Sequence, residues 1–432
     1  MKRGNRETIG ILLLLAVFFL MPRSVVARLS FQMGSLSLAF DELAVLFLLL
    51  ILMLKKVRKG PRNVPDRFYR QYLCLVTLVF FVSIGKGLWC GHDLALTVAS
   101  YVTLMVPALI AQRLERRSFF SRKIPLATTT VGCAVALQIV LVQVFPELVM
   151  NYFPGNLEKQ MMLQVVFRTF TTVGAATVTG PFLLVSSALG AIQYLSGGKR
   201  SILLLLMSGF TALGCVLTLS RSSVLALVAF YVVFFYLDTK KKRVYWTTLI
   251  LLSLLIGYAY SHLLPESYRR FTGTLDSEQS NELRVERLSS SIKMVERSPL
   301  LGVGVGQGFS RLYESDPAER IGKNGPLRIG NPHNQHLGFW MEGGTFFLLL
   351  FETAFFFFCL RNLWKRRWRG PLFLSVYLVI LLFFTVFMTE TILSLSMRTG
   401  LIFWIAFYAV SVEKVSGPGD YVSTEERPLE EC

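Results

Sequence analysis

The chain is dominated by long apolar runs that are separated by short, mostly basic segments. Of its 432 residues, 53% are hydrophobic and 13% are aromatic, which is more apolar material than a soluble protein of this size needs. Runs of about 17 to 25 apolar residues have the length that crosses the hydrocarbon core of a bilayer as a helix. The sequence therefore predicts an all-α polytopic membrane protein.

The apolar runs, divided at charged breaks, give about twelve expected membrane spans. The first run follows Lys2, Arg3 and Arg6 and lacks a small-residue cleavage site, so we interpret it as a retained signal-anchor helix rather than a signal peptide. We interpret residues 161–173 as a re-entrant or surface segment. The expected spans are 8–22, 38–54, 71–89, 94–111, 124–147, 174–196, 201–219, 222–238, 244–263, 334–360, 371–389 and 396–412.

Lys and Arg gather in alternate loops, which indicates how the helices are oriented. The basic loops of membrane proteins stay in the cytoplasm, and two short loops, 90–93 and 389–394, contain no Lys or Arg. We therefore expect both termini to be cytoplasmic. The basic loops are 55–70, 113–123, 239–243 and 361–369.

One long segment between the ninth and tenth spans breaks this pattern. Residues 264–333 lie outside in this topology, yet they contain ten Lys or Arg residues. Long loops cross membranes largely regardless of charge, so we attribute these cations to an anionic partner on the outer face. The net charge of +18 would suggest nucleic acid in a soluble protein, but here most of it lies in short loops. The expected organisation is spans 1–9 in residues 1–263, this outer loop, spans 10–12 in 334–412, and a disordered acidic tail in 413–432.

Cysteine and histidine are too scattered to form a disulfide framework or a metal centre. The six cysteines form no CxxC pair, and the four histidines show no metal-ligand spacing. We therefore expect neither a metal nor a cofactor.

Two of the four histidines lie together at the start of the tenth span. Asn331 suits a helix N-cap and Pro332 the first helical position, which would put His333 in the first turn at the outer end. The positive end of the helix dipole there favours a neutral imidazole and a nearby anion. A neutral base beside a bound anion suits glycosyl transfer from a lipid diphosphate. The alternative is an interfacial histidine that caps the helix and bonds water.

Two residues further along this span add to the candidate site. Gly344 follows His333 by eleven residues, or about three helical turns, so both would share one face, where a small residue admits a neighbouring helix. His336 lies one turn beyond His333. For His336 we favour a packed or supporting role over catalysis.

Arg221 lies in "LTLSRSSVLAL", between two apolar runs with almost no loop. The turn is so short that Arg221 must lie among helix ends, on the same outer side as His333. An arginine always carries its charge and binds phosphate with a bidentate fork. We favour a functional role for Arg221 over a charge that merely reaches the membrane boundary.

Arg284 is the best phosphate-binding candidate of the outer loop. Leu283, Leu288, Ile292 and Val295 have the spacing of an amphipathic helix that also carries Arg284 and Arg287. The glycines at 302, 304, 306 and 308 that follow do not fit the dinucleotide-binding GxGxxG pattern. We interpret them as a turn that packs against helix ends.

Several ionisable residues fall inside the expected spans: Asp41, Glu42, Lys86, Glu352 and Arg398. Charges inside a membrane are costly and are usually paired. They fit a proton relay in a transporter or structural ion pairs equally well. No repeated pattern of broken helices, which transporters show, is visible in the two halves.

The chain resembles the O-antigen ligase and O-antigen polymerase superfamily of bacterial inner-membrane glycosyltransferases, and is most similar to the ligases. The resemblance lies in "SRSS" at the end of a span, in Arg284 followed by "SPLLGVGVGQGF", and in His333-Asn334 followed by nine residues and Gly344. Glu342 precedes the glycine pair, and a twelve-span layout with one large outer loop also agrees. One departure is Phe347, where ligases often carry Gly, Thr or Tyr.

The resemblance implies a function and a role for each matched residue. A glycan would pass from undecaprenyl diphosphate to lipid A–core oligosaccharide on the periplasmic face, with inversion and without a metal. His333 would be the catalytic base, whereas Arg221, Arg284, Asn334 and His336 would bind the diphosphate or the substrate. The alternatives are a polymerase of lipid-linked repeat units, a lipid-glycan transporter and a non-catalytic envelope scaffold.

Overall fold

Long helices make up most of the structure, which is a computed structural model. About half of the chain is described in continuous stretches. The described stretches are 64–90, 94–115, 124–144, 176–196, 202–237, 277–308, 334–365, 371–388 and 397–412, together with 19–20, 31–33, 36–38, 46, 49–50, 171, 173, 321–322, 325–326, 332 and 393.

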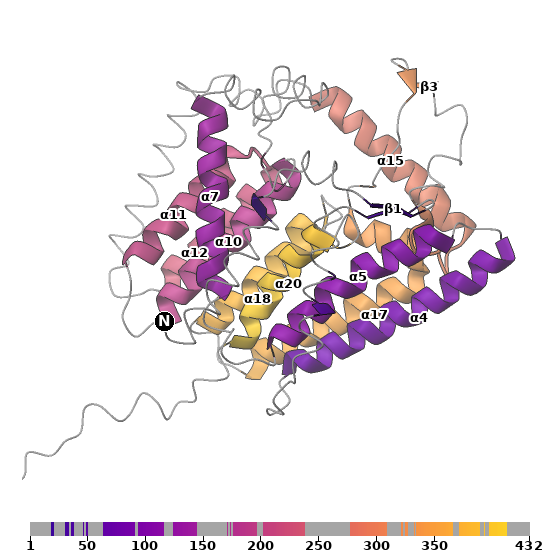
Figure 1. Cartoon of the computed structure of the whole chain (residues 1–432), viewed down its shortest axis with the longest axis horizontal. Helices are drawn as coiled ribbons and strands as arrows, with labels where there is room; N and C mark the ends of the chain where they lie inside the picture. Colours follow the sequence, from indigo (N-terminus) through magenta and orange to yellow (C-terminus); the bar gives the residue numbers. More distant parts are fainter. Residues whose placement is uncertain are drawn as a thin grey trace, which may run out of the picture.

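Nine of the expected spans coincide with helices in these stretches (Figure 1). The spans expected near 8–22, 38–54 and 244–263 fall largely outside the described residues, so the count of twelve stays a prediction. The helices are α4 (Val64–Cys90), α5 (Leu94–Glu115), α7 (Ile124–Val144), α10 (Ala176–Ser196), α11 (Ile202–Leu217), α12 (Arg221–Leu237), α17 (Gln335–Lys365), α18 (Pro371–Leu381), which continues into the π-helix η3 (Leu382–Val386), and α20 (Met397–Val412).

Two further kinds of element lie outside the expected spans. Helix α15 (Ser277–Arg297) belongs to the predicted outer loop. So does a small hairpin whose strands, β3 (Ile321–Gly322) and β4 (Gly325–Pro326), have two residues each. Strands β1 (Phe31–Met33) and β2 (Leu36–Leu38) form a second antiparallel hairpin, with Gln32 opposite Ser37. Leu38, the last residue of β2, is also the first residue of the span expected near 38–54, so a helix there would begin after it.

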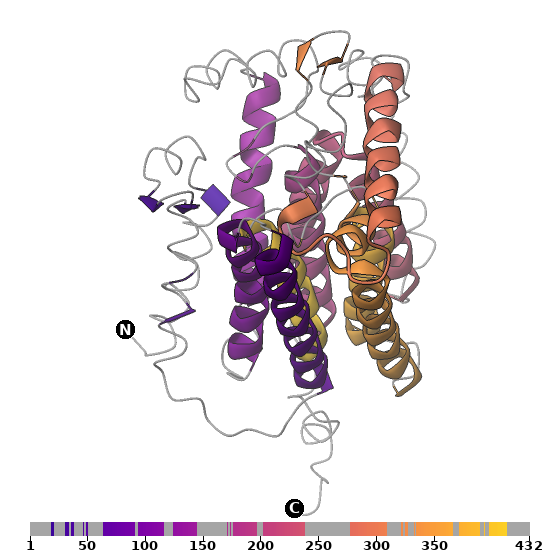
Figure 2. The same ribbon diagram turned by 90° about the vertical axis from the view of Figure 1, so that its right-hand side faces the viewer.

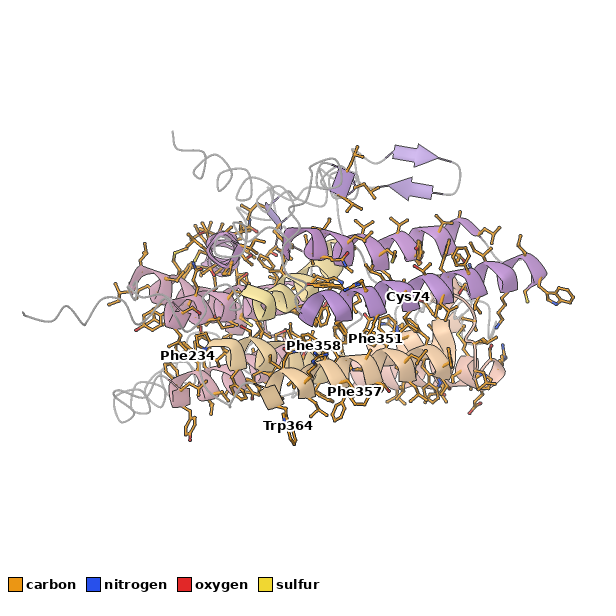
Figure 3. All side chains as sticks on the ribbon, turned by 90° about the horizontal axis from the view of Figure 1, so that it is seen from below. Cys74, Phe234, Phe351, Phe357, Phe358 and Trp364 are labelled. Carbon is orange, nitrogen blue, oxygen red and sulfur yellow. The ribbon has the colours of Figure 1, made fainter. Side chains whose placement is uncertain are left out.

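The described helices have the length and surface of a membrane protein. Five of them contain apolar windows long enough to cross a bilayer: Phe68–Cys90, Leu94–Gln112, Ile124–Leu141, Thr177–Ser196 and Gln335–Trp364. Figure 3 shows Phe357 and Trp364 pointing away from the helices, whereas Phe351 and Phe358 point inward. Trp89, near the end of α4, and Trp364 are about 90% exposed, at 90% and 91%. Apolar side chains with this exposure on long helices are typical of a lipid-facing surface.

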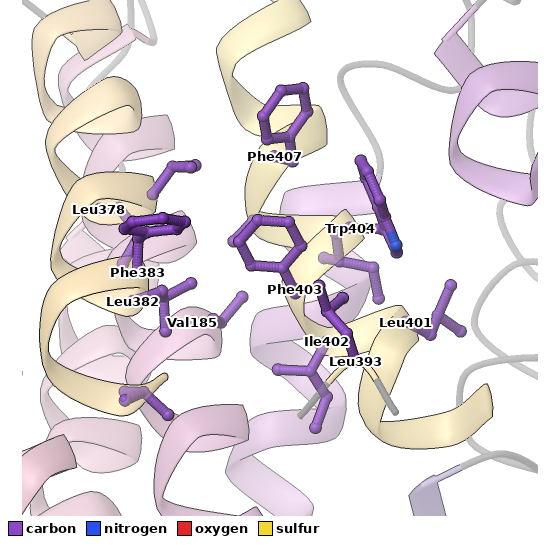
Figure 4. Close-up of a cluster of buried hydrophobic side chains, with 14 of the residues drawn as sticks. Val185, Leu378, Leu382, Phe383, Leu393, Leu401, Ile402, Phe403, Trp404 and Phe407 are labelled. Carbon is purple, nitrogen blue, oxygen red and sulfur yellow. The ribbon is translucent and has the colours of Figure 1, made fainter. Parts of the chain in front are cut away.

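The protein interior is rich in aromatic side chains. Figure 4 shows Phe383 of η3 on the side of the cluster that faces Phe403 of α20, and Phe387, directly after η3, packs against Phe403 with ring centroids 5.0 Å apart. Phe383 also stacks on Phe355 of α17, with ring centroids 3.9 Å apart. These contacts fasten α17, η3 and α20 to one another, and η3 is therefore well placed to support the start of α17.

A second interface holds α10 against α11 through small and hydroxyl side chains. Ser187 and Ser208 each donate a hydrogen bond to the other's backbone carbonyl, at 2.8 and 2.6 Å, and the Tyr231 hydroxyl of α12 lies within 2.8 Å of both hydroxyls. Small residues let helix backbones approach closely. Inside lipid, where the hydrophobic effect does not drive helices together, hydrogen bonds between hydroxyl groups and backbone carbonyls stabilise their association. This interface fixes the helices that carry the "SRSS" turn.

Candidate functional site

Helix α17 begins three residues later than the sequence indicated. The Asn334 side chain accepts a hydrogen bond from the Leu337 amide at 3.0 Å, and the Asn334 carbonyl accepts the Gly338 amide at 2.9 Å. Asn334 is therefore the N-cap, and the expected cap at Asn331 is wrong, because Pro332 is not helical. His333 lies outside the described residues and precedes this cap by one position in the sequence.

Helix α17 is broken at Gly344, which has φ 74° and ψ 178°. In a continuous helix His336 and Glu352 would lie about 24 Å apart along the axis, yet His336 Nδ1 and Glu352 Oε1 are 2.9 Å apart. Trp340 Nε1 likewise donates to Thr345 Oγ1 at 2.8 Å. Residues 335–343 therefore form a short arm that folds back beside a long arm, 345–365.

This bend changes which part of α17 can cross a membrane. The long arm is about 31 Å long, enough for a hydrocarbon core of about 30 Å, whereas the short arm is only about 14 Å long. The tenth span is therefore the long arm alone. The expectation that His333 and Gly344 share one face of a continuous helix is wrong for the same reason.

Residues 298–308, here named the capping turn, satisfy the backbone groups that the break exposes. The Val303 and Gly304 amides donate to the carbonyls of Met341 and Glu342, at 2.8 and 3.0 Å, at the end of the short arm. At the start of the long arm, the Thr345 amide donates to the Pro299 carbonyl at 2.8 Å. A helix end without such partners would be costly in a dry environment. The glycine-rich turn predicted to pack against helix ends is confirmed in this form.

The capping turn needs glycine where its backbone meets the bend. A Cβ atom on Gly344 would lie 2.1 Å from the Leu300 carbonyl oxygen, and one on Gly302 would lie 2.4 Å from the Glu342 carbonyl oxygen. Both residues also have positive φ angles, 74° and 66°. The backbones can therefore touch only because neither residue has a side chain.

Two ionisable side chains, Lys86 and Glu342, contact the two ends of the capping turn. Lys86 of α4 donates to Ser298 Oγ at 2.7 Å and to the Gly302 carbonyl. Glu342, only 4% exposed, faces the backbone amides of Gly306 and Gly308. Within the described part of the chain, its Oε1 atom has no hydrogen-bond partner. Sequence patterns flagged Lys86 only as a charge within a span and noted Glu342 only for its place beside the glycines.

His336 has both ring nitrogens engaged inside the protein. Nδ1 faces Glu352 Oε1 at 2.9 Å, and Nε2 lies 3.2 Å from the Phe383 carbonyl. A carbonyl can only accept, so Nε2 carries a hydrogen. The predicted substrate contact of His336 would have to replace one of these bonds, and the geometry instead favours the supporting role considered for it.

The π-helix η3 and its C-cap residue Phe387 supply the carbonyl groups that anchor the short arm. A π-helix shifts the backbone pairing to i→i−5, as the Phe387 amide shows by donating to the Leu382 carbonyl at 3.0 Å. The Phe387 carbonyl then accepts the Gln335 amide at 2.7 Å, and the Phe383 carbonyl meets His336. The start of α17 is therefore fixed to η3 by its first two residues.

Arg221 is the first residue of α12, and its side chain is exposed. The turn before it contains Leu219, which has a positive φ of 58°. Ser220 and Ser223 pack so tightly on α10 that a Cβ atom on Gly180 would lie 2.7 to 2.8 Å from their side chains. The short turn between two apolar helices, which the sequence indicated, is confirmed.

Arg284 lies on α15, thirteen residues before the helix ends at Arg297. The C-terminal end of α15 packs on the short arm, where Met294 and Val295 form a buried cluster with Leu337 and Met341. The predicted helix is confirmed, but its predicted apolar stripe is only partly buried: Val295 is buried, whereas Leu288 and Ile292 are exposed, at 44% and 39%. The buried face instead carries Ser290, Ser291, Met294 and Val295.

Among the candidate site residues, the side chains of Asn334, His336 and Arg221 are described, and their roles toward a substrate stay predictions. Asn334 and His336 lie together at the start of the short arm. The side chains of Arg284 and Arg398 and all of Asp41 and Glu42 lie outside the described residues. Of the ionisable residues inside expected spans, Lys86 and Glu352 have the structural partners described above. Among described side chains, no group of three or more His, Cys, Asp or Glu is placed to hold a metal.

Comparison with known proteins gives one family match, and it covers the segment that contains the candidate site. A family model described as O-antigen ligase matches residues 202–352, from the first residue of α11 to Glu352 in the long arm of α17. The resemblance drawn from the sequence is therefore confirmed over the segment that carries Arg221, α15, the capping turn and the short arm. A comparison with curated proteins found no match.

Proposed function

We propose that the protein is an O-antigen ligase of the bacterial inner membrane. It transfers a glycan from undecaprenyl diphosphate to the lipid A–core oligosaccharide on the periplasmic face. The observation that carries this proposal is the family match over residues 202–352, because this segment holds the candidate base and both candidate arginines. We take the basic loop at 361–369, which follows the long arm of α17, to be cytoplasmic, so the bend at Gly344 and the short arm beside it would lie in the outer half of the membrane.

In the proposed reaction, His333 accepts the proton of the acceptor hydroxyl as that oxygen attacks the anomeric carbon. The bond between this carbon and the diphosphate oxygen breaks, and undecaprenyl diphosphate leaves with the electron pair. Arg221 and Arg284 bind the diphosphate and stabilise its growing charge. A single displacement of this kind inverts the anomeric centre.

The start of α17 offers fewer backbone amides to an anion than a helix N-terminus with free amides would. The Gln335 and Leu337 amides are already bonded to Phe387 and Asn334, so they are not available to an anion. In this proposal the arginines therefore stabilise the negative charge of the diphosphate, which suits a reaction without a metal. Asn334 can still offer its side-chain amide, whose nitrogen lies 3.9 Å from Met388 Sδ, a weak acceptor.

Reconstitution with both lipid substrates tests the proposal. Purified protein in detergent, given an undecaprenyl-diphosphate-linked glycan and lipid A–core, should form a new glycosidic bond, and a chelator should not change the rate. A transporter or a scaffold would form no bond in this assay. Loss of transfer on chelation, restored by a divalent cation, would contradict the metal-independent mechanism alone.

The polymerase is the second candidate, favoured by Phe347 at a position where ligases often carry Gly, Thr or Tyr. Phe347 is buried, and its ring packs against Phe339 with centroids 5.0 Å apart. Glycan length in a deletion strain separates the two functions. Loss of all polymer from lipid A indicates a ligase, whereas single repeats on lipid A indicate a polymerase.

Arg221→Lys should lower kcat/KM for the donor about 10- to 100-fold, because lysine keeps the charge but loses the two-point hydrogen bond to phosphate. The measurement is the initial transfer rate as a function of donor concentration. Arg361→Lys is the matched control. Arg361 is also exposed, but it lies near the end of the long arm that is farthest from the bend at Gly344. A donor kcat/KM unchanged by Arg221→Lys would remove Arg221 from the site.

A further inference from the structure

The capping turn joins α15 to the membrane helices, and Lys86 and Glu342 contact it from two different helices. Lys86 lies within the apolar window of α4, near its end, and is half-buried. Its ammonium group contacts Ser298 and Gly302, and Ser298 Oγ itself donates to the Gly302 carbonyl at 2.6 Å. A membrane-buried lysine is costly and is retained where it has a specific partner. Here that partner is the start of the capping turn.

The second half of the capping turn is held by neighbouring side chains. Glu342 faces the amides of Gly306 and Gly308. Ser83 Oγ accepts the Val305 amide at 3.0 Å, and the Gln307 side chain donates to Thr97 Oγ1 at 3.2 Å. Every hydrogen bond of this set connects the turn to α4, α5 or the short arm, so the turn has a defined position on the membrane helices.

The capping turn, together with the packing of Met294 and Val295 on the short arm, sets the direction of α15. The helix ends at Arg297 and the turn begins at Ser298, with no linker between them. Figure 2 shows α15 standing above the helices that it meets at its lower end. Arg284 lies about 20 Å along the axis from that end. A tilt of about 10° would displace it by about 3.5 Å, far more than the roughly 0.5 Å that a reacting site tolerates.

We propose that Lys86 and Glu342 are positioning residues that hold α15 at the angle at which Arg284 reaches the donor diphosphate. This inference rests on the proposed function, in which Arg284 binds that diphosphate. It assigns to Lys86 of α4 and to Glu342 of the short arm an indirect part in binding a charged lipid that neither touches.

Binding of undecaprenyl diphosphate to the purified protein tests this proposal without relying on turnover. Lys86→Met should weaken binding about tenfold, the effect of losing a hydrogen bond that involves a charged group, and Glu342→Leu, which removes both carboxyl oxygens, should weaken it several-fold. Lys86→Arg, which keeps charge and donors, should restore most of the affinity. Lys293→Met is the matched control, because it removes the same charge from an exposed position on α15 and should leave binding unchanged.

A double mutant separates positioning from an independent effect. If Lys86 acts through Arg284, then Lys86→Met should weaken binding no further in an Arg284→Ala background. Effects that multiply would overturn the inference and leave the proposed function intact. Arg284→Ala with unchanged binding would instead remove the proposed role of Arg284, and with it the role inferred for Lys86.

A distance measurement tests the direction of α15 directly. Spin labels on the exposed Cys90 at the end of α4 and on Ser289→Cys, exposed on α15, report the angle between the two helices. The protein for this experiment would lack Cys74 and Cys432. A narrow distance distribution should broaden in Lys86→Met and in Glu342→Leu. An unchanged distribution in both variants would overturn the inference, whatever happens to activity.

Discussion

His333→Ala should lower the rate of glycan transfer about 10²- to 10⁴-fold, the usual contribution of a general base. The folded structure should survive the change. The cap of α17 is Asn334, and the contacts that fix the short arm come from Gln335, His336 and Leu337. None of these contacts uses the side chain of His333. The loss should therefore appear in kcat, while binding of undecaprenyl diphosphate stays the same.

The experiment compares His333→Ala with His92→Ala, which removes a histidine from the short segment between α4 and α5. Transfer rates, thermal unfolding in detergent and binding of undecaprenyl diphosphate would be measured for both. Wild-type transfer by His333→Ala would exclude His333 as the base. A parallel fall in stability and activity would show that the residue supports the fold rather than the chemistry.

The positions of the helices could be predicted because each depends on a local pattern of apolar and charged residues. An apolar run between charged residues must cross the membrane or lie against it, whatever its neighbours do. The runs at 71–89, 94–111 and 124–147 therefore match α4, α5 and α7. The turn before Arg221 was predictable for a related reason, because too few residues separate two apolar runs to form anything larger.

The break at Gly344 could not be predicted in the same way, because both arms of α17 have the composition of one long span. A pair of glycines inside an apolar run was the available signal. It was interpreted as a close approach of helices, whereas the partner is the capping turn, about 40 residues earlier. The N-cap was misplaced because Asn331 and Asn334 suit the role equally well, and only the bond to Leu337 decides between them.

The orientation of α15 shows a second limit of periodicity. The hydrophobic residues of the helix suggested a buried face, but the structure buries Ser290 and Ser291 and exposes Val285 and Leu288. Packing of the last turn on Leu337 and Met341 sets this rotation, and no pattern within residues 277–297 contains that information. The same holds for Lys86, whose partners lie more than 200 residues away.

Gly344→Ala should be the most damaging single substitution outside the proposed catalytic residues. The φ and ψ angles of Gly344, 74° and 178°, belong to a region that only glycine occupies at low cost. The new Cβ atom would also lie 2.1 Å from the Leu300 carbonyl oxygen, which is backbone and cannot rotate away. Strain of this kind together with overpacking should destabilise the protein by roughly 3 kcal/mol or more.

Relief of this strain would separate the two arms of α17 from the capping turn. The hydrogen bonds of Thr345 to Pro299 and of Val303 to Met341 would be lost together, and His336 would move away from Glu352. We therefore expect transfer activity to fall more steeply than the folded fraction. Gly209→Ala in α11 is the control, because no heavy atom lies within 4 Å of its Cβ position and alanine favours a helix there. Equal thermal stability and activity of the two variants would show that the bend does not constrain the site.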